Sequence, residues 1–87
     1  MNSKQDKGKS WFLYLLECKD GSYYTGITTN LKKRIKKHQE GKGSKYVYAR
    51  GFKRVLASKS FKNRSEASKK EYIVKQLPRE QKIEWFD

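Results

Sequence analysis

The stretch from residue 11 to residue 28 constrains the fold most, because two strand-like segments there are separated by a short turn sequence. Trp11–Cys18 is nearly all apolar, short and rich in aromatic residues, which is typical of a central strand covered on both faces. Lys19–Gly21 has turn chemistry, and Ser22–Thr28 then predicts the returning strand of a hairpin. Gly26 interrupts the side-chain row of that strand, as glycine does at a bulge or where another group approaches closely.

A helix is predicted directly after this hairpin. Asn30 is a suitable N-cap for a helix over residues 31–40. Gly41 and Gly43 end it, and we expect them to open a flexible loop over residues 42–51.

The second half of the chain predicts one more strand and two more helices. Residues 54–61 form the predicted third strand, and Asn63 with Glu66 makes a capping-box pattern that opens a helix to about residue 76. After Pro78, a short helix from about residue 79 is expected to cover the sheet with three apolar side chains, Ile83, Trp85 and Phe86. The order β-β-α-β-α-α predicts a small α+β fold.

Length and cysteine content limit the organisation of the chain. Its 87 residues allow one small domain, which we place at residues 10–87 behind a flexible basic N-terminal tail at residues 1–9. Cys18 is the only cysteine, so an internal disulfide is excluded and a buried small hydrophobe is expected. No apolar run approaches the roughly 18 residues that span a bilayer, and the N-terminus lacks a signal-peptide core. We therefore expect a cytoplasmic protein without membrane contact.

Positive charge is concentrated in two central segments. The chain carries 22 Lys and Arg against 9 Asp and Glu, a net charge of +13. Residues 30–45 hold seven basic side chains with Glu40 as the one acid, and residues 50–64 hold six basic side chains and no acid. Such a field attracts polyphosphates, and aromatic residues interleave it, so nucleic acid is the expected partner. The alternative is a generically basic protein.

Arg34 and His38 border the apolar stripe of the first helix. Leu31 and Ile35 are four residues apart and define that stripe, and each is followed three residues later by Arg34 or His38. Four lysines at positions 32, 33, 36 and 37 should point outward. The alternative for the bordering pair is a snorkelling arginine beside a half-buried histidine.

Glu71, Tyr14 and Tyr24 complete the set of candidate site residues. Ala67 and Val74 place Glu71 on the inward face of its helix, where a carboxylate is rarely buried unless it is paired or coordinates an ion. An ion pair with Lys75 is the alternative. Tyr14 and Tyr24, in turn, could be an ordinary cross-strand aromatic pair.

Together these side chains suit phosphodiester hydrolysis. A carboxylate can hold one divalent cation that neutralises charge on the phosphate and the leaving oxygen. An arginine stabilises phosphoryl oxygens as charge develops, and a tyrosine can act as a base if cations lower its pKa.

At these residues the chain resembles the GIY-YIG nuclease superfamily, in particular its small single-domain bacterial members, which are similar to the nuclease domain of the Slx1 structure-specific endonucleases. The resemblance covers about residues 10–77. Phe12-Leu13-Tyr14 stands for Gly-Ile-Tyr and Tyr24-Thr25-Gly26 for Tyr-Ile-Gly. Arg34, His38 and Glu71 fall at the family's helix arginine, its His or Tyr, and its metal-binding glutamate. Residues 41–46 look like a loop typical of the small members.

The resemblance implies a three-stranded antiparallel sheet flanked by helices and one-metal cleavage of a phosphodiester, usually in DNA. By analogy Glu71 holds Mg²⁺ or Mn²⁺ and Arg34 stabilises the scissile phosphate. Tyr14 or Tyr24 is the general base, with Tyr24 slightly favoured, and His38 orients water or assists proton transfer.

The sequence also departs from the family pattern. Phe12 replaces the first glycine, Ile27 stands where the excision-repair branch has a lysine, and no matching asparagine follows Glu71. We expect no second domain, so substrate selection falls to this domain's own surface or to a partner protein.

The glycine-framed basic loop supplies the candidates for nucleic-acid contact, because such a loop can stack on and clamp a strand. Its alternative is a solvated mobile loop. The expected activity is an endonuclease on DNA, branched or single-stranded, with RNA left open. A binding module with a very slow or inactive site is the alternative, and a structural adaptor is less favoured. The loop candidates are Lys42, Lys45, Tyr46, Tyr48 and Arg50.

Overall fold

The computed structural model describes residues 10–87; the tail predicted for residues 1–9 lies outside the described residues. Strand β1 spans Trp11–Cys18 and pairs antiparallel with β2, Tyr23–Thr28. Asp20 shapes the turn between them by accepting hydrogen bonds from the backbone N–H (3.0 Å) and the hydroxyl (2.6 Å) of Ser22. The predicted hairpin is therefore confirmed.

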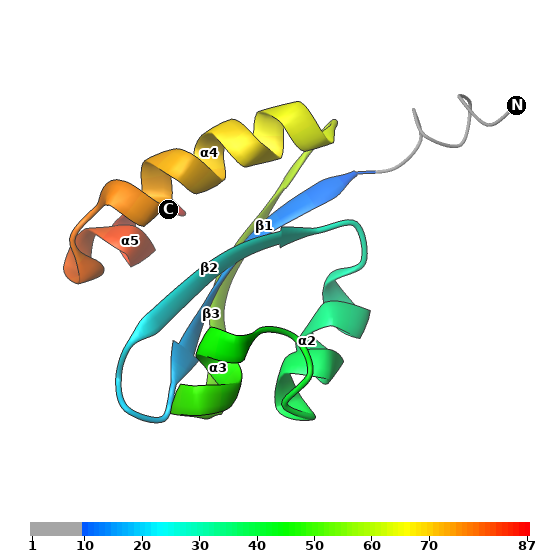
Figure 1. Cartoon of the computed structure of the whole chain (residues 1–87). Coiled ribbons are helices and arrows are strands. Elements are labelled where there is room, and N and C mark those ends of the chain that lie inside the picture. The colour runs from blue at the N-terminus through cyan, green and yellow to red at the C-terminus, as the bar shows by residue number, and fades with distance from the viewer. Residues whose placement is uncertain (1–9) are drawn as a thin grey trace, which may run out of the picture.

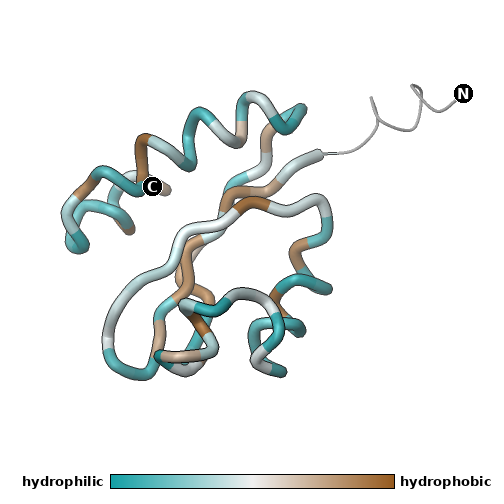
Figure 2. Tube along the Cα trace, viewed as in Figure 1, coloured by the Kyte–Doolittle hydropathy of each residue, from teal (hydrophilic) through white to brown (hydrophobic). Residues whose placement is uncertain are grey.

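Strand β3, Phe52–Phe61, pairs antiparallel with the other edge of β1, so the sheet order is β2-β1-β3. Residues 13–16 of β1 and Cys18 are fully buried, as the apolar run predicts for a central strand. In Figure 2 this strand is brown over most of its length. The three-stranded antiparallel sheet and the α+β class are confirmed.

The helices lie on the two faces of the sheet (Figure 1). Helix α2, Leu31–Gln39, and helix α3, Lys45–Arg50, cover the face that carries the cluster of Tyr14, Leu16, Cys18 and Val47. Helix α4, Arg64–Gln76, packs on the opposite face, followed by the short helix α5, Arg79–Trp85. Side chains alternate direction along a strand, so every second residue of β1 faces α2 and α3, and the residues between them face α4.

Helix α3 corrects the prediction of a flexible loop over residues 42–51. The Ser44 side chain accepts a hydrogen bond from the backbone N–H of Val47 at 3.1 Å, which caps the helix N-terminus. Val47 is 1% exposed and packs into the core cluster. Gly51 ends the helix at φ +84°, a conformation that favours glycine. A cap at each end and one buried side chain are thus enough to order the segment.

The C-terminal helix α5 is tied to α4. The Lys82 ammonium donates hydrogen bonds to the carbonyls of Val74 (2.8 Å) and Lys75 (3.3 Å), which satisfies the C-terminus of α4. Trp85 reaches the sheet where the Lys59 ammonium lies 5.2 Å from its ring centroid. Within residues 10–87, none of the helices is long and apolar enough to cross a membrane.

Candidate active site

A buried tyrosine–histidine pair links the centre of the sheet to helix α2. Tyr14 Oη and His38 Nε2 lie 2.8 Å apart in a hydrogen bond, and the side chains are 0% and 2% exposed. Tyr14 sits midway along β1, and His38 is in the last turn of α2. The helix phasing that placed His38 beside the apolar stripe is confirmed, and the residue is fully buried rather than half-buried.

Two glycines make room for this pair. Gly26 lies opposite Tyr14 in the β1–β2 register, and a Cβ atom there would stand 2.5 Å from Tyr14 Oη and 3.0 Å from Tyr24 Cε2. Of the two explanations for Gly26, close approach applies. A Cβ atom on Gly43 would overlap the His38 ring, so the loop after α2 also closes over the pair.

Burial holds His38 in its neutral form. Desolvation, aided by the positive charge of Arg34, lowers the His38 pKa below its ordinary value. Its Nε2 is occupied by Tyr14, whereas Nδ1 is buried and has no hydrogen-bond partner among the described residues. In a neutral imidazole one nitrogen donates and the other accepts. Neither nitrogen is therefore open to solvent.

Burial also keeps Tyr14 protonated. Desolvation is the main reason that the Tyr14 pKa rises to about 12, and the nearby Tyr24 and Glu71 add to the increase. The Arg34 guanidinium opposes it. Tyr14 is therefore a poor base at neutral pH, and the charges of Arg34 and Glu71 both act on its hydroxyl.

Tyr24 connects this buried pair to the surface. Its ring centroid lies 5.4 Å from that of His38, 6.2 Å from that of Tyr14 and 5.7 Å from that of Tyr46. Unlike Tyr14, it is partly exposed. Of the two candidate bases, Tyr14 and Tyr24, only Tyr24 can be reached by solvent.

Glu71 lies on α4 with its side chain 22% exposed, and its Oε2 is 3.4 Å from Lys75 Nζ. The expected alternative, an ion pair one turn along the helix, is thus observed. Within the described part of the chain, no cluster of three His, Cys, Asp or Glu side chains could enclose a metal ion. Mg²⁺ commonly takes one or two carboxylates plus waters and substrate phosphate. A single open carboxylate fits that kind of site, and does not fit a closed protein cage.

Arg34 opens onto a polar cleft of about 510 Å³ at the edge of α2. The lysines at 33 and 37, expected only to point outward, line this cleft, and Lys42 reaches it from the following loop. Helical phasing could not place Lys42, because the loop folds back on α2 through a 2.8 Å hydrogen bond from Lys42 N–H to the Lys37 carbonyl.

The five loop residues expected to contact nucleic acid separate into two groups. Lys42, Lys45 and Tyr48 line one shallow depression of about 290 Å³, and Tyr48 is 73% exposed. Arg50 instead forms a 2.7 Å ion pair with Asp20, and its guanidinium lies 4.5 Å from the Tyr46 ring centroid. Tyr46 and Arg50 are thus engaged within the protein.

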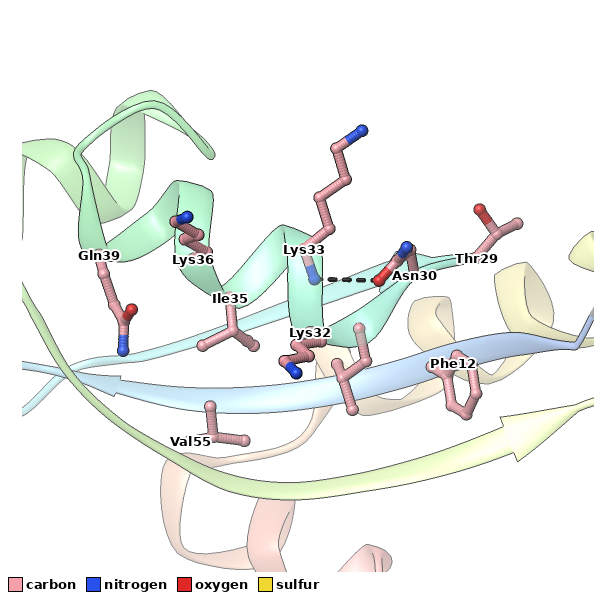
Figure 3. Close-up of a pocket in the computed structure, with 10 residues that line it drawn as sticks. Phe12, Thr29, Asn30, Lys32, Lys33, Ile35, Lys36, Gln39 and Val55 are labelled. Carbon is pink, nitrogen blue, oxygen red and sulfur yellow. Dashed lines mark hydrogen bonds between the residues drawn. The ribbon is translucent and has the colours of Figure 1, made fainter.

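A larger groove of about 1080 Å³ lies on another side of α2, between that helix and the sheet (Figure 3). Its apolar walls come from Phe12, Leu31, Ile35 and Val55. None of the candidate catalytic residues lines it. Of the candidate catalytic residues, Arg34 lines the smaller polar cleft instead.

Known proteins resemble this chain in sequence and in fold. Residues 10–84 match the family described as the GIY-YIG catalytic domain. UPF0213 protein BH0048 of Halalkalibacterium halodurans is 52% identical over 71 residues, which span 82% of this chain and 76% of the relative. The solution NMR structure of UPF0213 protein BH0048 from Bacillus halodurans has a TM-score of 0.55 and 49% identity, and covers 87% of this chain and 81% of that chain. The solution NMR structure of protein EF2693 from E. faecalis has a TM-score of 0.61 and 37% identity, and covers 92% and 85% respectively.

Proposed function

We propose that this chain, which belongs to the GIY-YIG family, is a divalent-metal-dependent endonuclease that hydrolyses phosphodiester bonds in DNA. The family supports a nuclease-type function with a nucleic-acid substrate. The observation that carries the proposal is the buried Tyr14–His38 hydrogen bond. The partly exposed Tyr24 packs beside both rings, and Arg34, which lines the polar cleft, acts on the Tyr14 hydroxyl. Branched or single-stranded DNA is the proposed substrate form.

Arg34 is the proposed contact to the scissile phosphate. It lines the cleft and is only partly exposed, so its guanidinium can donate to phosphoryl oxygens with little competition from water. Such donors stabilise the transition state most when charge develops on those oxygens.

Tyr24 is the proposed general base. In its tyrosinate form its phenolate oxygen accepts a proton from the water that attacks the phosphorus atom, and the neutral hydroxyl forms again. Tyr14 is unsuited to that step, because it is buried and its pKa of about 12 keeps it protonated. Tyr24 is partly exposed, so water can reach it.

His38 is proposed as a positioning residue. Its Nε2 is held by Tyr14 and its Nδ1 is buried against Gly43, so contact with the attacking water is blocked at both nitrogens. The neutral imidazole fixes the Tyr14 ring, and Tyr14 in turn packs beside Tyr24. This role replaces the direct action on water expected from the sequence.

Glu71 would hold Mg²⁺ or Mn²⁺ together with water and a substrate phosphate oxygen. The bound ion supplies neutralisation of charge on the phosphate and the leaving oxygen. Lys75, which pairs with Glu71 and is 53% exposed, is long enough to turn into solvent when the carboxylate is engaged.

A nucleic-acid-binding module with an inactive or very slow centre is the second candidate. One observation favours it: Glu71 is held in an ion pair, and within residues 10–87 it belongs to no cluster of three His, Cys, Asp or Glu side chains that could hold a metal ion. Both candidates bind nucleic acid, and only the first cuts it. A protein partner that supplies specificity is compatible with either candidate.

A cleavage assay separates the two candidates. Purified protein is incubated with end-labelled single-stranded, duplex and branched DNA, with Mg²⁺, with Mn²⁺ and with chelator. Tyr24→Phe and Arg34→Gln should lower the metal-dependent cleavage rate by roughly 100-fold or more. Tyr72→Phe, at a tyrosine of α4 that is 69% exposed, and Lys32→Gln are the matched controls and should cut like wild type. Cutting that is absent, or equal in all variants, would leave the binding module.

A further inference from the structure

Cations without acidic partners converge on the cleft beside Arg34. Its wall contains four basic side chains and no acid, and the remaining lining residues are polar or glycine. Among the described residues, every ion pair that an acidic side chain forms is with another cation, such as Arg50, Arg54 or Lys75. The uncompensated charge makes the cleft a site for an anion. The four cations are Lys33, Arg34, Lys37 and Lys42.

The cleft is built by backbone contacts rather than by surface lysines alone. Thr28 Oγ1 accepts a 3.1 Å hydrogen bond from the Asn30 N–H and fixes the entry to α2. On the far side, the Lys42 N–H bonds to the Lys37 carbonyl at 2.8 Å. Gly43 packs on the buried His38 ring. The two walls therefore keep their positions relative to the candidate active site.

The two faces of α2 differ in what their lysines border. Lys37 lines the cleft and Lys36 lines the apolar groove. Lys33 borders both, and Figure 3 shows its side chain extending away from the groove, whereas Lys32 lies low over it. Lys33 with Lys37 and Lys32 with Lys36 are thus two pairs of equal charge and spacing, turned by about 100° from each other around the helix axis.

The cleft continues into the depression that holds Tyr48. Lys42 lines both hollows, and Lys45 and Tyr48 follow it. A track of cations that leads to one exposed aromatic ring suits one strand of nucleic acid, whose phosphates contact the cations while a base stacks on the ring. A lone inorganic phosphate would occupy the first hollow and leave the second unused.

We propose that the cleft formed by Lys33, Lys37 and Lys42 is a second phosphate site, which holds the phosphodiester next to the scissile one and leads a single strand to Tyr48. This inference rests on the proposed nuclease function, since it takes Arg34 as the contact to the scissile phosphate. On this proposal the Lys33 and Lys37 face of α2 binds the substrate, and the Lys32 and Lys36 face does not.

The test is binding of a fluorescently labelled single-stranded DNA oligonucleotide, followed by anisotropy at several salt concentrations in chelator, where no metal-dependent cleavage occurs. Lys33→Gln/Lys37→Gln should weaken binding by roughly tenfold and reduce the slope of log K against log salt by about 0.7 for each phosphate that the variant no longer neutralises. Lys32→Gln/Lys36→Gln should stay within about twofold of wild type with an unchanged slope. Equal weakening in both double variants would overturn the proposal, because it indicates a delocalised field without a site.

The stacking part of the track has its own matched pair. Tyr48→Ala should weaken binding roughly tenfold and leave the salt slope unchanged. Tyr72→Ala, at a similarly exposed tyrosine on α4, should bind like wild type. Equal behaviour of the two variants would overturn the strand path beyond Lys42.

Failure of the nuclease proposal can be told apart from failure of this one. Wild-type protein that never cuts DNA, yet shows the difference between the two lysine pairs, overturns the activity and retains the phosphate site. Protein that cuts DNA and shows no such difference retains the activity and overturns the phosphate site.

Discussion

Replacing Gly26 by alanine should damage the candidate active site from within the sheet. The backbone of Gly26 does not have positive φ, so alanine is permitted there and the effect comes from its Cβ alone. That atom would lie 2.5 Å from Tyr14 Oη, whereas ordinary contact begins at 3.4 Å, so the hydroxyl must retreat by about 0.9 Å. A shift of that size disrupts the 2.8 Å hydrogen bond to His38.

The magnitude follows from two contributions. Overpacking of a buried site costs roughly 1–3 kcal/mol. Loss of the hydrogen bond leaves His38 buried with both ring nitrogens unpartnered, which adds about 1 kcal/mol or more. We expect the free energy of unfolding to fall by about 2–4 kcal/mol, which lowers the Tm by roughly 10 °C or more in a domain of this size.

Urea unfolding followed by circular dichroism measures this change. The decisive control is a double-mutant cycle with Tyr14→Phe, which removes the atom that the new Cβ would meet first. Tyr14 Cζ, which the new Cβ would meet at 2.7 Å, remains in that background, so Gly26→Ala should still be destabilising. Its cost should nevertheless be about 1 kcal/mol lower than in wild type, because no hydrogen bond to His38 is left to lose. A Gly26→Ala protein as stable as wild type, or equal costs in both backgrounds, would refute the close-approach reasoning.

Three further predictions concern the same region. Folding raises the Tyr14 pKa from 10.0 to about 12, so the protonated Tyr14 stabilises the folded state fully below pH 10. This stabilisation falls by about 2–3 kcal/mol as the pH rises through 12. Urea titrations should show that the free energy of unfolding falls more steeply with alkaline pH in wild type than in Tyr14→Phe, and equal slopes would contradict this. Gly43→Ala should destabilise the protein by roughly 1–3 kcal/mol, because its Cβ overlaps the His38 ring; an unchanged thermal midpoint would count against this packing. Ser44→Ala should cost about 1 kcal/mol in urea unfolding through loss of the α3 cap, and no change would show that the cap is dispensable.

Patterns within a few neighbouring residues predict most of the helices and strands. Asn30 and Asn63 are the observed N-caps, and their side chains accept hydrogen bonds from the N–H groups of Lys33 and Glu66. A capping side chain acts within three residues, so its effect is visible in the sequence. The apolar run of β1 likewise predicts its burial directly.

The sequence does not predict the short helix α3, because Gly41 and Gly43 directly before it indicate a loop. Its own evidence was present in Ser44 and Gly51, an N-cap and a C-cap seven residues apart. What holds so short a helix, however, is the burial of Val47 against β1, and that contact depends on the tertiary fold.

Contacts between distant residues could not be predicted from periodicity. Phasing places His38 near the sheet, but it does not show that Nε2 meets the hydroxyl of Tyr14, 24 residues away. It also gave no indication that Arg50 pairs with Asp20 across 30 residues. The candidate site therefore came from residue types, and its internal roles depend on the fold.

The most direct test of the nuclease proposal is the metal-dependent cleavage rate of Glu71→Gln beside Glu66→Gln. Both glutamates lie on α4, and both have a lysine partner, so the two variants change charge equally. With Mg²⁺ and end-labelled branched DNA, Glu71→Gln should cut at least roughly 100-fold more slowly than wild type. Glu66→Gln should cut at the wild-type rate. Equal rates in the two variants, or a wild-type protein that cuts equally well in chelator, would contradict a catalytic centre at Glu71.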